Sequence, residues 1–377
     1  MKIGIDARFF GGEHAKGLGR YTQKLIENLE SVESEKHEFV IFLRKDNWEL
    51  YQPSSRRFHK VLADFQWYSF EEQIKFPRVL NAEQCDLVHF PHYNVPLLYR
   101  RPFVVTIHDL ILHHFPTVRA STLAPVKYWL KHAAYKLVIG SAVRNAKAVI
   151  AVSKFTKDDI VKTFRCDPEK VNVTYEAADP ICNVPARDFE LIVQRFRLPI
   201  PYALYVGNAY PHKNLEVLLD VARELKERGS RLHIVLVGRK EFFFERLQAR
   251  VHERKLDDQI HFPGYVSDQD LPGLYHHAMM YVFPSLYEGF GLPPLEAMQC
   301  GIPVVSSNES CLPEIFEDSV LFVNSHDAKD IAAKMMQFEG SASSREEYVR
   351  RGREHVQKFS WKRMAEETYA HYCRVLS

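Results

Sequence analysis

One stretch decides the fold of this chain: Pro284-Ser-Leu-Tyr-Glu-Gly-Phe-Gly-Leu-Pro-Pro-Leu-Glu-Ala-Met-Gln-Cys-Gly301. A short apolar run, residues 278–283, precedes it and is typical of a buried strand. Two prolines then begin a predicted helix, because the N–H groups that proline lacks would have no hydrogen-bond partner within the first helical turn. Gly301 suits the position just beyond the end of that helix. The stretch therefore predicts a strand, a glycine-rich loop and the N-terminus of a helix.

The N-terminus of that helix predicts an anion site, because its unpaired N–H groups and the helix dipole both favour phosphate. Two carboxylates lie in the same stretch, Glu288 in the predicted loop and Glu296 about one turn into the helix. A carboxylate repels phosphate, so these two side chains are better suited to accepting hydrogen bonds from hydroxyl groups. Hydroxyl groups beside phosphates indicate a sugar nucleotide.

Composition narrows the class of protein. A length of 377 residues predicts two or three domains. A net charge of +2 is too balanced to indicate a nucleic-acid partner. The six cysteines are scattered and form no CxxC pair, which argues against a zinc ribbon and predicts reduced thiols in a cytoplasmic protein. The N-terminus is charged too early for a secretory signal, and no run of 18 apolar residues predicts a membrane span.

Short runs rich in valine and isoleucine alternate with helical patterns along the chain. Twelve of them are predicted strands: 2–7, 38–43, 86–90, 103–107, 148–152, 171–175, 202–206, 232–237, 259–262, 280–283, 303–306 and 320–323. Apolar strands separated by helices indicate parallel sheets covered on both faces. Twelve strands are too many for one ordinary sheet, so the sequence predicts two doubly wound α/β domains, which bind ligands beyond the carboxyl ends of their strands. Two prolines in residues 179–185 mark the predicted boundary.

Three further segments could contact a ligand. A glycine-containing loop with Gly17 and Gly19 follows the first predicted strand; it could approach an anion, or simply provide backbone turns. His108 ends the strand 103–107, where a histidine either faces a ligand or bonds a neighbouring loop. Lys213 lies near a predicted helix N-terminus, where a cation opposes the helix dipole unless an anion is bound. A solvated lysine is the alternative.

Two other patterns have simpler explanations. Asp268-Gln-Asp270 has the DxD spacing of some metal sites, but helix capping after Ser267 explains it better. The basic and aromatic helix predicted over 126–138 could rest on a membrane surface, although a core-facing helix with solvated lysines is slightly favoured.

Five segments, in the same order along the chain, resemble the retaining glycosyltransferases of family 4, which have the GT-B fold. They are residues 17–21, the strand ending in His108-Asp109, residues 152–160, residues 211–215, and the E-x7-E arrangement of Glu288 and Glu296. The resemblance implies two Rossmann-like domains that face each other across a cleft: residues 1–180 for the acceptor, completed by a C-terminal helix over 360–377, and residues 181–359 for the nucleotide sugar.

The resemblance also implies roles for individual residues. Glu296 is expected to bind the ribose hydroxyls, Glu288 the hydroxyls of the transferred sugar, and Lys213 the diphosphate. The full predicted set is His108, Lys213 and Glu288 for catalysis, and Gly17, Gly19, Asn208, Lys213, Glu288, Gly289, Phe290, Gly291, Leu292 and Glu296 for the donor. The sequence departs from the family at Asn208, where many members have an arginine, so Arg239 is a candidate substitute.

The resulting expectation is a cytoplasmic, metal-independent transferase that moves a hexose, with retention, onto a glycan or lipid-linked hydroxyl. The resemblance favours GDP-mannose as the donor, with UDP-glucose or UDP-N-acetylglucosamine next, no further cofactor, and peripheral contact with the inner face of the membrane. Two alternatives stay open: a nucleotide-sugar epimerase of the same fold and a non-catalytic nucleotide-binding protein.

Overall fold

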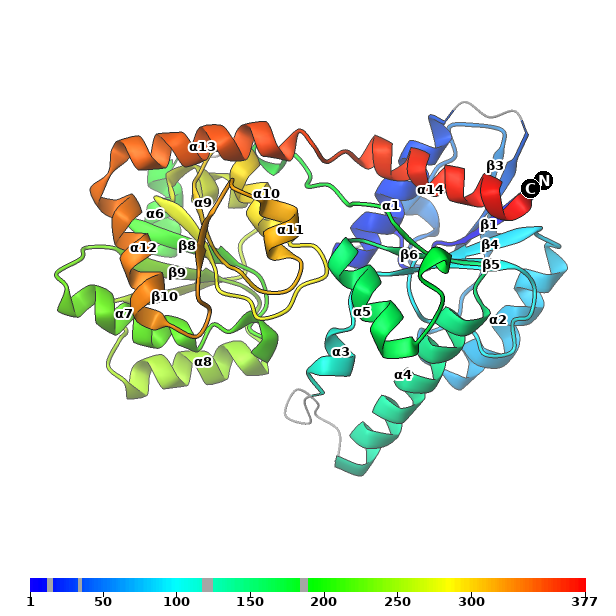
Figure 1. The fold of residues 1–377 in the computed structure, drawn as a ribbon, viewed down its shortest axis with the longest axis horizontal. Coiled ribbons are helices and arrows are strands. Elements are labelled where there is room, and N and C mark those ends of the chain that lie inside the picture. Colours follow the sequence, from blue (N-terminus) through cyan, green and yellow to red (C-terminus); the bar gives the residue numbers. More distant parts are fainter. Residues whose placement is uncertain (12–15, 33–35, 117–124, 184–188) are drawn as a thin grey trace. The chain divides into compact units, whose positions relative to one another are not determined.

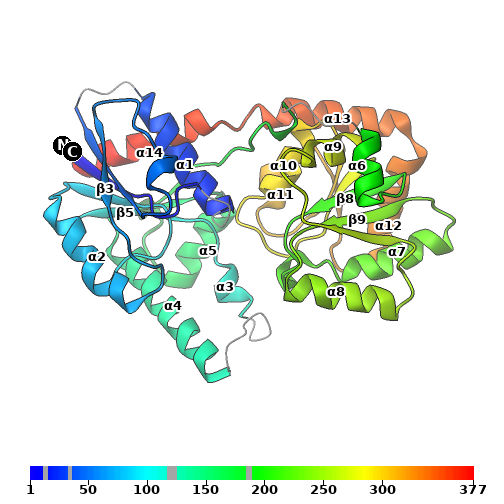
Figure 2. The same cartoon turned by 180° about the vertical axis from the view of Figure 1, so that it is seen from behind.

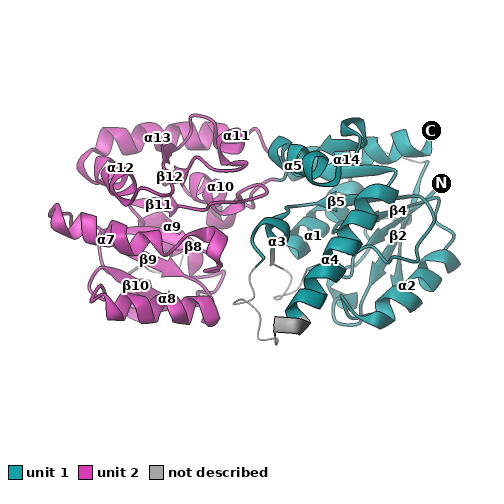
Figure 3. Ribbon diagram, turned by 60° about the horizontal axis from the view of Figure 1, so that its bottom comes forward, with its two compact units in different colours: residues 1–118, 123–176, 360–377 teal, residues 119–122, 177–359 magenta. Residues whose placement is uncertain are grey.

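The computed structural model describes residues 1–11, 16–32, 36–116, 125–183 and 189–377. Gly12 of the first glycine loop and residues 184–185 of the predicted boundary lie outside this range. The chain divides into two compact units, coloured separately in Figure 3. Unit 1 comprises Met1–Val118, Leu123–Glu176 and Ser360–Ser377, and unit 2 comprises essentially Ala177–Phe359.

Unit 1 contains a parallel sheet with seven described strands, in the order β3-β2-β1-β4-β5-β6-β7. Its strands are β1 Lys2–Asp6, β2 Glu38–Leu43, β3 Phe58–Leu62, β4 Leu87–Phe90, β5 Phe103–Ile107, β6 Ala148–Ala151 and β7 Val171–Val173. Its helices are α1 Lys16–Glu30, η1 Trp48–Leu50, α2 Phe70–Ala82, α3 Ile111–His114, α4 Pro125–Asn145, α5 Lys154–Phe164, η3 Pro168–Lys170 and α14 Trp361–Leu376.

Successive side chains of a strand point to opposite faces, so the sheet of unit 1 has a core on each side. Phe39, Ile41 and Leu43 pack with α1 and α14, whereas Val40 and Phe42 pack with α2, α4 and α5. Helix α14 returns to this unit from the far end of the sequence, and the two termini lie side by side (Figures 1 and 2). Ser360 caps α14, as predicted, by accepting a hydrogen bond from the Arg363 N–H.

Unit 2 contains a second parallel sheet, with six described strands in the order β10-β9-β8-β11-β12-β13. These strands are β8 Tyr202–Val206, β9 His233–Val237, β10 Ile260–Gly264, β11 Met280–Phe283, β12 Val304–Ser307 and β13 Leu321–Val323. The helices are η4 Ile181–Asn183, α6 Phe189–Phe196, η5 Pro211–Lys213, α7 Val217–Glu227, α8 Phe242–Glu253, α9 Leu271–His277, α10 Leu292–Gln299, α11 Leu312–Phe316, α12 Ala328–Gly340 and α13 Ala342–Val356.

All twelve predicted strands are present, each within about two residues of its predicted bounds. The sequence missed β3, an edge strand in which only Phe58 is buried. A short edge strand with solvent-exposed residues lacks the continuous apolar run that identified the central strands. The doubly wound α/β class is therefore confirmed for both units.

Two expectations from the sequence are wrong. Cys182 and Cys300 form a disulfide across 118 residues of sequence, so not all six cysteines are free thiols. Helix α4 buries His132 and Ile139, but Trp129, Leu130 and Leu137 are exposed, so this helix is not simply core-facing. The side chains of 125–127 are outside the described set. Within the described residues, no helix is both long and apolar enough to span a bilayer.

Candidate functional site

The strand orders place a ligand-binding edge in each unit. In an open parallel sheet, ligands bind beyond the carboxyl ends of the strands, at the point where the connections reverse direction. In unit 2 this reversal lies between the neighbouring strands β8 and β11. The segment after β8 contains Lys213, and the loop after β11 contains Glu288. The two predicted residues thus follow the two strands that flank the reversal.

The predicted strand, loop and helix of residues 278–301 are all present, as β11, its following loop and α10. Gly291 precedes the helix with a φ of +100°, a conformation that side chains rarely adopt. A Cβ atom there would lie 3.0 Å from both Leu312 and Phe316. Gly301 follows the helix with a φ of +73°. At position 291, only glycine combines a positive φ with the lack of a Cβ atom, so the N-terminus of the helix depends on this residue.

Lys213 and Glu288 lie together as an ion pair. The Lys213 ammonium donates to both carboxylate oxygens of Glu288, at 2.6 and 2.8 Å. The side chains are only 14% and 9% exposed, so solvent screens the pair weakly. The sequence assigned these residues to different parts of a donor and did not predict that they contact each other.

Neighbouring polar groups fix both members of the pair. Asn214 donates from its amide to the carbonyls of Pro284 and Ser325, at 3.2 and 2.8 Å, and so ties the Lys213 turn to the loop after β11. The backbone N–H of Glu288 donates to the Ser310 hydroxyl at 3.0 Å. Sequence reasoning missed Asn214 and Ser310, although Asn214 stands beside Lys213 in the matched segment 211–215.

Other predicted residues of unit 2 have these positions. Glu296 is buried, 8% exposed, one turn into α10. Asn208 is exposed, and its side-chain oxygen accepts from the Tyr210 N–H at 3.4 Å. The Arg239 guanidinium lies 5.4 Å from the centre of the Tyr265 ring, just beyond β9. Asp270 of the DxD pattern is at the N-cap of α9 but makes no side-chain capping bond there; its carboxylate accepts from Arg195 at 2.8 Å and from Ser267 at 2.9 Å.

In unit 1, His108 follows β5 and both of its ring nitrogens have acceptors. Nδ1 lies 2.8 Å from a carboxylate oxygen of Glu176, and Nε2 lies 2.9 Å from the carbonyl oxygen of Pro91. A carbonyl only accepts, so Nε2 carries a proton, and a carboxylate at Nδ1 favours a second one. Glu176 follows the predicted strand 171–175, and that position at a sheet edge is the signal that could have found it.

Electrostatics of the His108 surroundings favour the imidazolium form. Burial alone would lower the His108 pKa, but the Glu176 hydrogen bond and charge, the Pro91 carbonyl and Asp109 together raise it above the ordinary value. Burial, followed by repulsion from His108, lowers the pKa of His89 and of His92 to about 3. The surroundings therefore favour protonation of His108 and disfavour protonation of His89 and His92.

The loop predicted around Gly17 and Gly19 is helical in the structure. Both residues lie in the first turn of α1, not in a loop before it. The Gly19 carbonyl accepts from the N–H of Gly11 at 3.4 Å, which ties the helix start to the segment after β1. The apolar face of α1, with Leu25 and Leu29 in the core, outweighs the low helix propensity of two glycines. Both residues belong to unit 1.

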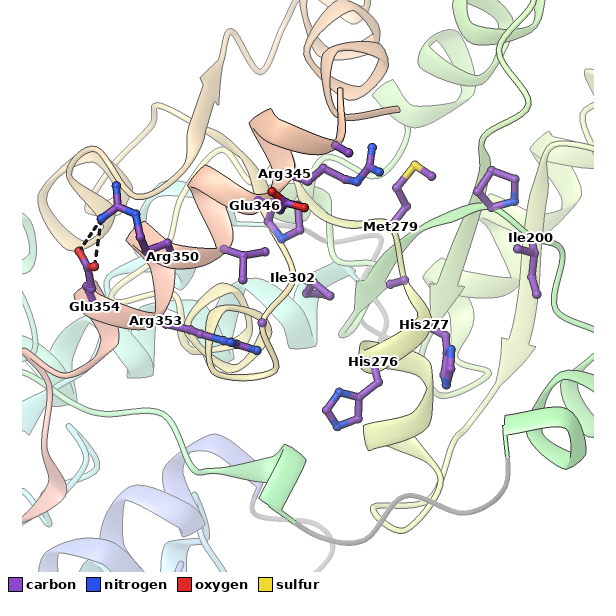
Figure 4. Close-up of a pocket in the computed structure, with 16 residues that line it drawn as sticks. Ile200, His276, His277, Met279, Ile302, Arg345, Glu346, Arg350, Arg353 and Glu354 are labelled. Atoms are coloured by element: carbon purple, nitrogen blue, oxygen red, sulfur yellow. Dashed lines mark hydrogen bonds and ion pairs between the residues drawn. The ribbon is translucent and has the colours of Figure 1, made fainter. Parts of the chain in front are cut away.

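A cavity of about 640 Å³ lies elsewhere in unit 2 (Figure 4). It is lined from α9, α13 and the segments before β8 and β12, with Arg353 opposite His276 and Arg350 paired to Glu354 at 3.0 Å. Lys213, Glu288 and Glu296 are not among its lining residues. The cavity is therefore separate from the candidate site at the reversal of the sheet.

The chain is similar to several known proteins. The chain is 33% identical over 290 residues to O-antigen chain mannosyltransferase B of Escherichia coli, covering 76% of this chain and 74% of the relative. Its fold is similar to that of sucrose-phosphate synthase from Thermosynechococcus elongatus (TM-score 0.74, 21% identity, 100% and 99% of the chains). It is also similar to Anabaena Alr3699/HepE, solved with UDP and glucose (TM-score 0.72, 16% identity, 99% of each chain).

Two family descriptions divide the chain between them. Residues 15–180 match Glycosyltransferase Family 4, and residues 189–355 match Glycosyl transferases group 1. Together with the two doubly wound sheets, these matches confirm the GT-B class predicted from the sequence. The chain therefore belongs to the glycosyltransferases, with a first half of the family 4 type and a second half of the group 1 type.

Proposed function

We propose that this protein transfers mannose from GDP-mannose to a hydroxyl group of a growing surface glycan, with retention at the anomeric carbon. The observation that carries the proposal is the Lys213–Glu288 ion pair at the reversal of the unit 2 sheet, next to the N-terminus of α10. A cation and an acceptor for hydroxyl groups, side by side, support binding of a sugar diphosphate. Mannose rests on the similarity to an O-antigen mannosyltransferase.

The chemistry requires stabilisation of a leaving group. As the glycosidic bond breaks, negative charge builds on the β-phosphate, and preorganised donors at that point lower the barrier. We assign this role to Lys213 and to the N–H groups around Phe290, Gly291 and Leu292. Glu296 would accept hydrogen bonds from the ribose, and Glu288, released by Lys213, from the transferred sugar. His108, in unit 1, is assigned as a donor of hydrogen bonds to a substrate hydroxyl.

Retention and metal independence are part of the same proposal. We favour a front-face route in which the departing phosphate takes the acceptor proton, since no enzymic nucleophile stands out. Mass spectrometry of stalled reactions tests this, because a covalent glycosyl-enzyme would contradict it. Lys213 and the helix N-terminus supply the positive charge that a metal ion supplies in other transferases. Turnover should therefore survive EDTA, and loss of activity that Mg²⁺ or Mn²⁺ restores would contradict metal independence.

The exposed apolar side chains of α4 favour peripheral contact with the inner face of a membrane. Trp129, Leu130 and Leu137 are 52–66% exposed, and Lys131 and Lys136 lie on the same helix. Apolar and basic side chains together suit an interface with anionic lipid. A lipid-linked acceptor would be reached there. Sedimentation with anionic vesicles, compared between wild type and a Trp129→Ser/Leu130→Ser variant, tests this part of the proposal.

The test of the donor is a thermal-shift screen with GDP, UDP, ADP and their sugars. A ligand that binds only the folded protein raises its melting temperature, so GDP-mannose should give the largest shift. Incubation with labelled donor alone then separates the alternatives. An epimerase converts the sugar without a second substrate, a transferase at most hydrolyses it slowly, and a non-catalytic protein leaves it intact.

A further inference from the structure

The sheet of unit 1 has its own reversal of connections, between the neighbouring strands β1 and β4. Phe9 lies just after β1 and His92 just after β4, and their rings are 5.4 Å apart between centroids. His92 also follows Pro91, whose carbonyl accepts from His108. In this unit, aromatic rings next to His108 thus lie at the position where a parallel sheet binds ligands.

These rings are part of a larger aromatic cluster, which we define as Phe9, Trp67, Tyr68, His92 and Tyr93. Phe9 stacks on Trp67 at 4.4 Å, and His92 lies 3.9 Å from Tyr93. Tyr68 approaches both His92 and Tyr93, at 6.2 and 6.4 Å. His92 is neutral because burial lowers its pKa to about 3. The cluster therefore presents uncharged aromatic rings at the edge of the sheet.

A buried ionic network holds the three loops that carry the cluster. The Arg8 guanidinium binds Asp6 through two nitrogens, at 2.8 and 2.7 Å, and lies 2.7 Å from Glu72. Glu72 also accepts from the side-chain amide of Asn94 at 2.7 Å and from the backbone N–H of Tyr68 at 2.8 Å. The side chains of Arg8 and Glu72 are fully buried. Charges buried and satisfied in this way fix the loops in one arrangement.

Tyr68 itself combines exposure with backbone strain. Tyr68 is 58% exposed, and its ring lies 6.4 Å from that of Tyr93. Its φ is +60°, in the left-handed region that is unfavourable for an aromatic residue. The Glu72 carboxylate maintains this conformation through the Tyr68 N–H. A buried carboxylate thus stabilises a strained backbone that presents one aromatic ring to solvent. Backbone strain of this kind is concentrated at functional sites.

We propose that this aromatic cluster, with Tyr68 at its exposed face, is the subsite that binds a pyranose ring of the acceptor glycan. A pyranose has a face of C–H groups that packs on an aromatic ring and a rim of hydroxyls that hydrogen-bonds to neighbouring polar groups. The absence of a free charge on the five cluster residues suits a neutral sugar. Its position beside His108 suits the acceptor. This inference rests on the proposed glycosyl transfer for the identity of the ligand.

The test is saturation-transfer NMR on the full-length protein with methyl α-mannopyranoside, methyl α-glucopyranoside and methyl α-N-acetylglucosaminide as probes. At least one probe should receive saturation at its ring C–H protons. Tyr68→Ala should reduce its affinity roughly tenfold, as expected for loss of one stacked ring, and Tyr68→Phe should retain it. Tyr68→Gly removes the ring and relieves the positive φ, so it should lose the probe while melting no lower than Tyr68→Ala.

The matched control is Phe70→Ala, two residues away, because Phe70 is 81% exposed and has no ring contact among the described residues. It should leave probe binding unchanged. The inference is overturned if no pyranoside binds, if the Tyr68 and Phe70 variants behave alike, or if a polyisoprenyl phosphate alone binds in a Tyr68-dependent way. Thermal shifts with GDP and UDP run in parallel: a pyranoside that binds without any nucleotide binding would contradict the proposed function and leave this subsite intact.

Discussion

The ammonium group of Lys213 binds both carboxylate oxygens of Glu288, 75 residues further along the chain. Each residue of this pair thus neutralises the other. A diphosphate that binds Lys213 competes with this carboxylate, and a sugar whose hydroxyls reach Glu288 provides it with a new partner. A nucleoside diphosphate without the sugar replaces Glu288 as the partner of Lys213 but gives Glu288 no new partner. We infer that the intact sugar nucleotide is bound more tightly than the free nucleoside diphosphate.

Removing one member of this pair should cost more than removing both. Lys213→Met leaves the buried Glu288 carboxylate without its cation, whereas Lys213→Met/Glu288→Gln leaves no charge behind. We expect a coupling of about 1–3 kcal/mol between the two substitutions. Thermal or urea unfolding of the wild type, both single variants and the double variant measures it. Additive effects would mean that the contact contributes nothing to stability.

Glu296 and Glu288 should be separable by kinetics. Glu296→Ala should weaken binding of the nucleotide about tenfold or more, because it removes an acceptor of ribose hydrogen bonds. Glu288→Ala should mainly lower kcat, because its hydroxyl partners belong to the sugar that moves. Titration calorimetry with GDP and initial rates with the donor distinguish the two. Glu317→Ala, an exposed carboxylate of the same unit, is the control, and unchanged activity in both test variants would refute the site.

Glu176→Gln should shift a pH profile toward lower pH. The pKa of His108 is raised, so the stability that its charge contributes is complete below about pH 6.5, the usual value for histidine, and is lost as pH rises through the raised pKa. Tyr21, His89, His92 and Asp109 also face this ring or its charge. Without the Glu176 carboxylate, burial should lower the pKa.

Two-dimensional NMR of the His108 Cε1–H group measures that titration directly, and the rate against pH provides a second measurement. The exposed Glu169→Gln substitution should leave both curves in place. A Glu176→Gln protein with the wild-type titration would show that the carboxylate does not hold the proton.

The disulfide should stabilise unit 2. It joins η4 to the end of α10 and closes a loop of 118 residues, so reducing it should cost about 2–4 kcal/mol of unfolding free energy. Cys182→Ser should lower the melting temperature in oxidising buffer and make it insensitive to dithiothreitol. Cys373→Ser, at a half-buried free cysteine, is the control. Peptide mapping without reductant that finds Cys182 unmodified and free would contradict the bond.

The sequence predicted strands and helices, which have local patterns, and missed contacts between residues far apart in the chain. Strands 202–206 and 280–283 were visible because buried parallel strands are continuously apolar. The helix after Pro293 was visible because proline and glycine have strict positional preferences. In contrast, no local pattern indicates that Lys213 contacts Glu288, or that Cys182 meets Cys300. Such contacts depend on strand order, which a single sequence does not specify.

The position of a residue at the end of a strand proved more informative than its type. His108 and Glu176 both follow predicted strands, and the order of β5, β6 and β7 brings those strand ends to one edge. Gly17 and Gly19 are typical loop residues but lie in α1, because burial of the apolar face of that helix outweighs the low helix propensity of glycine. Phe9 and His92 formed no recognisable motif, since only the order β1-β4 brings them together.

Helix α14 has a consequence for the order in which the protein folds as it is synthesised. Met364, Ala365 and Tyr372 fill the core of unit 1, and the Tyr372 hydroxyl lies 2.5 Å from Nδ1 of His89. The segment Ala177–Phe359 of unit 2 is complete before these residues leave the ribosome. Unit 1, although translated first, lacks α14 on one face of its sheet until residues 360–377 arrive. The second unit to be translated is therefore the first that can fold completely.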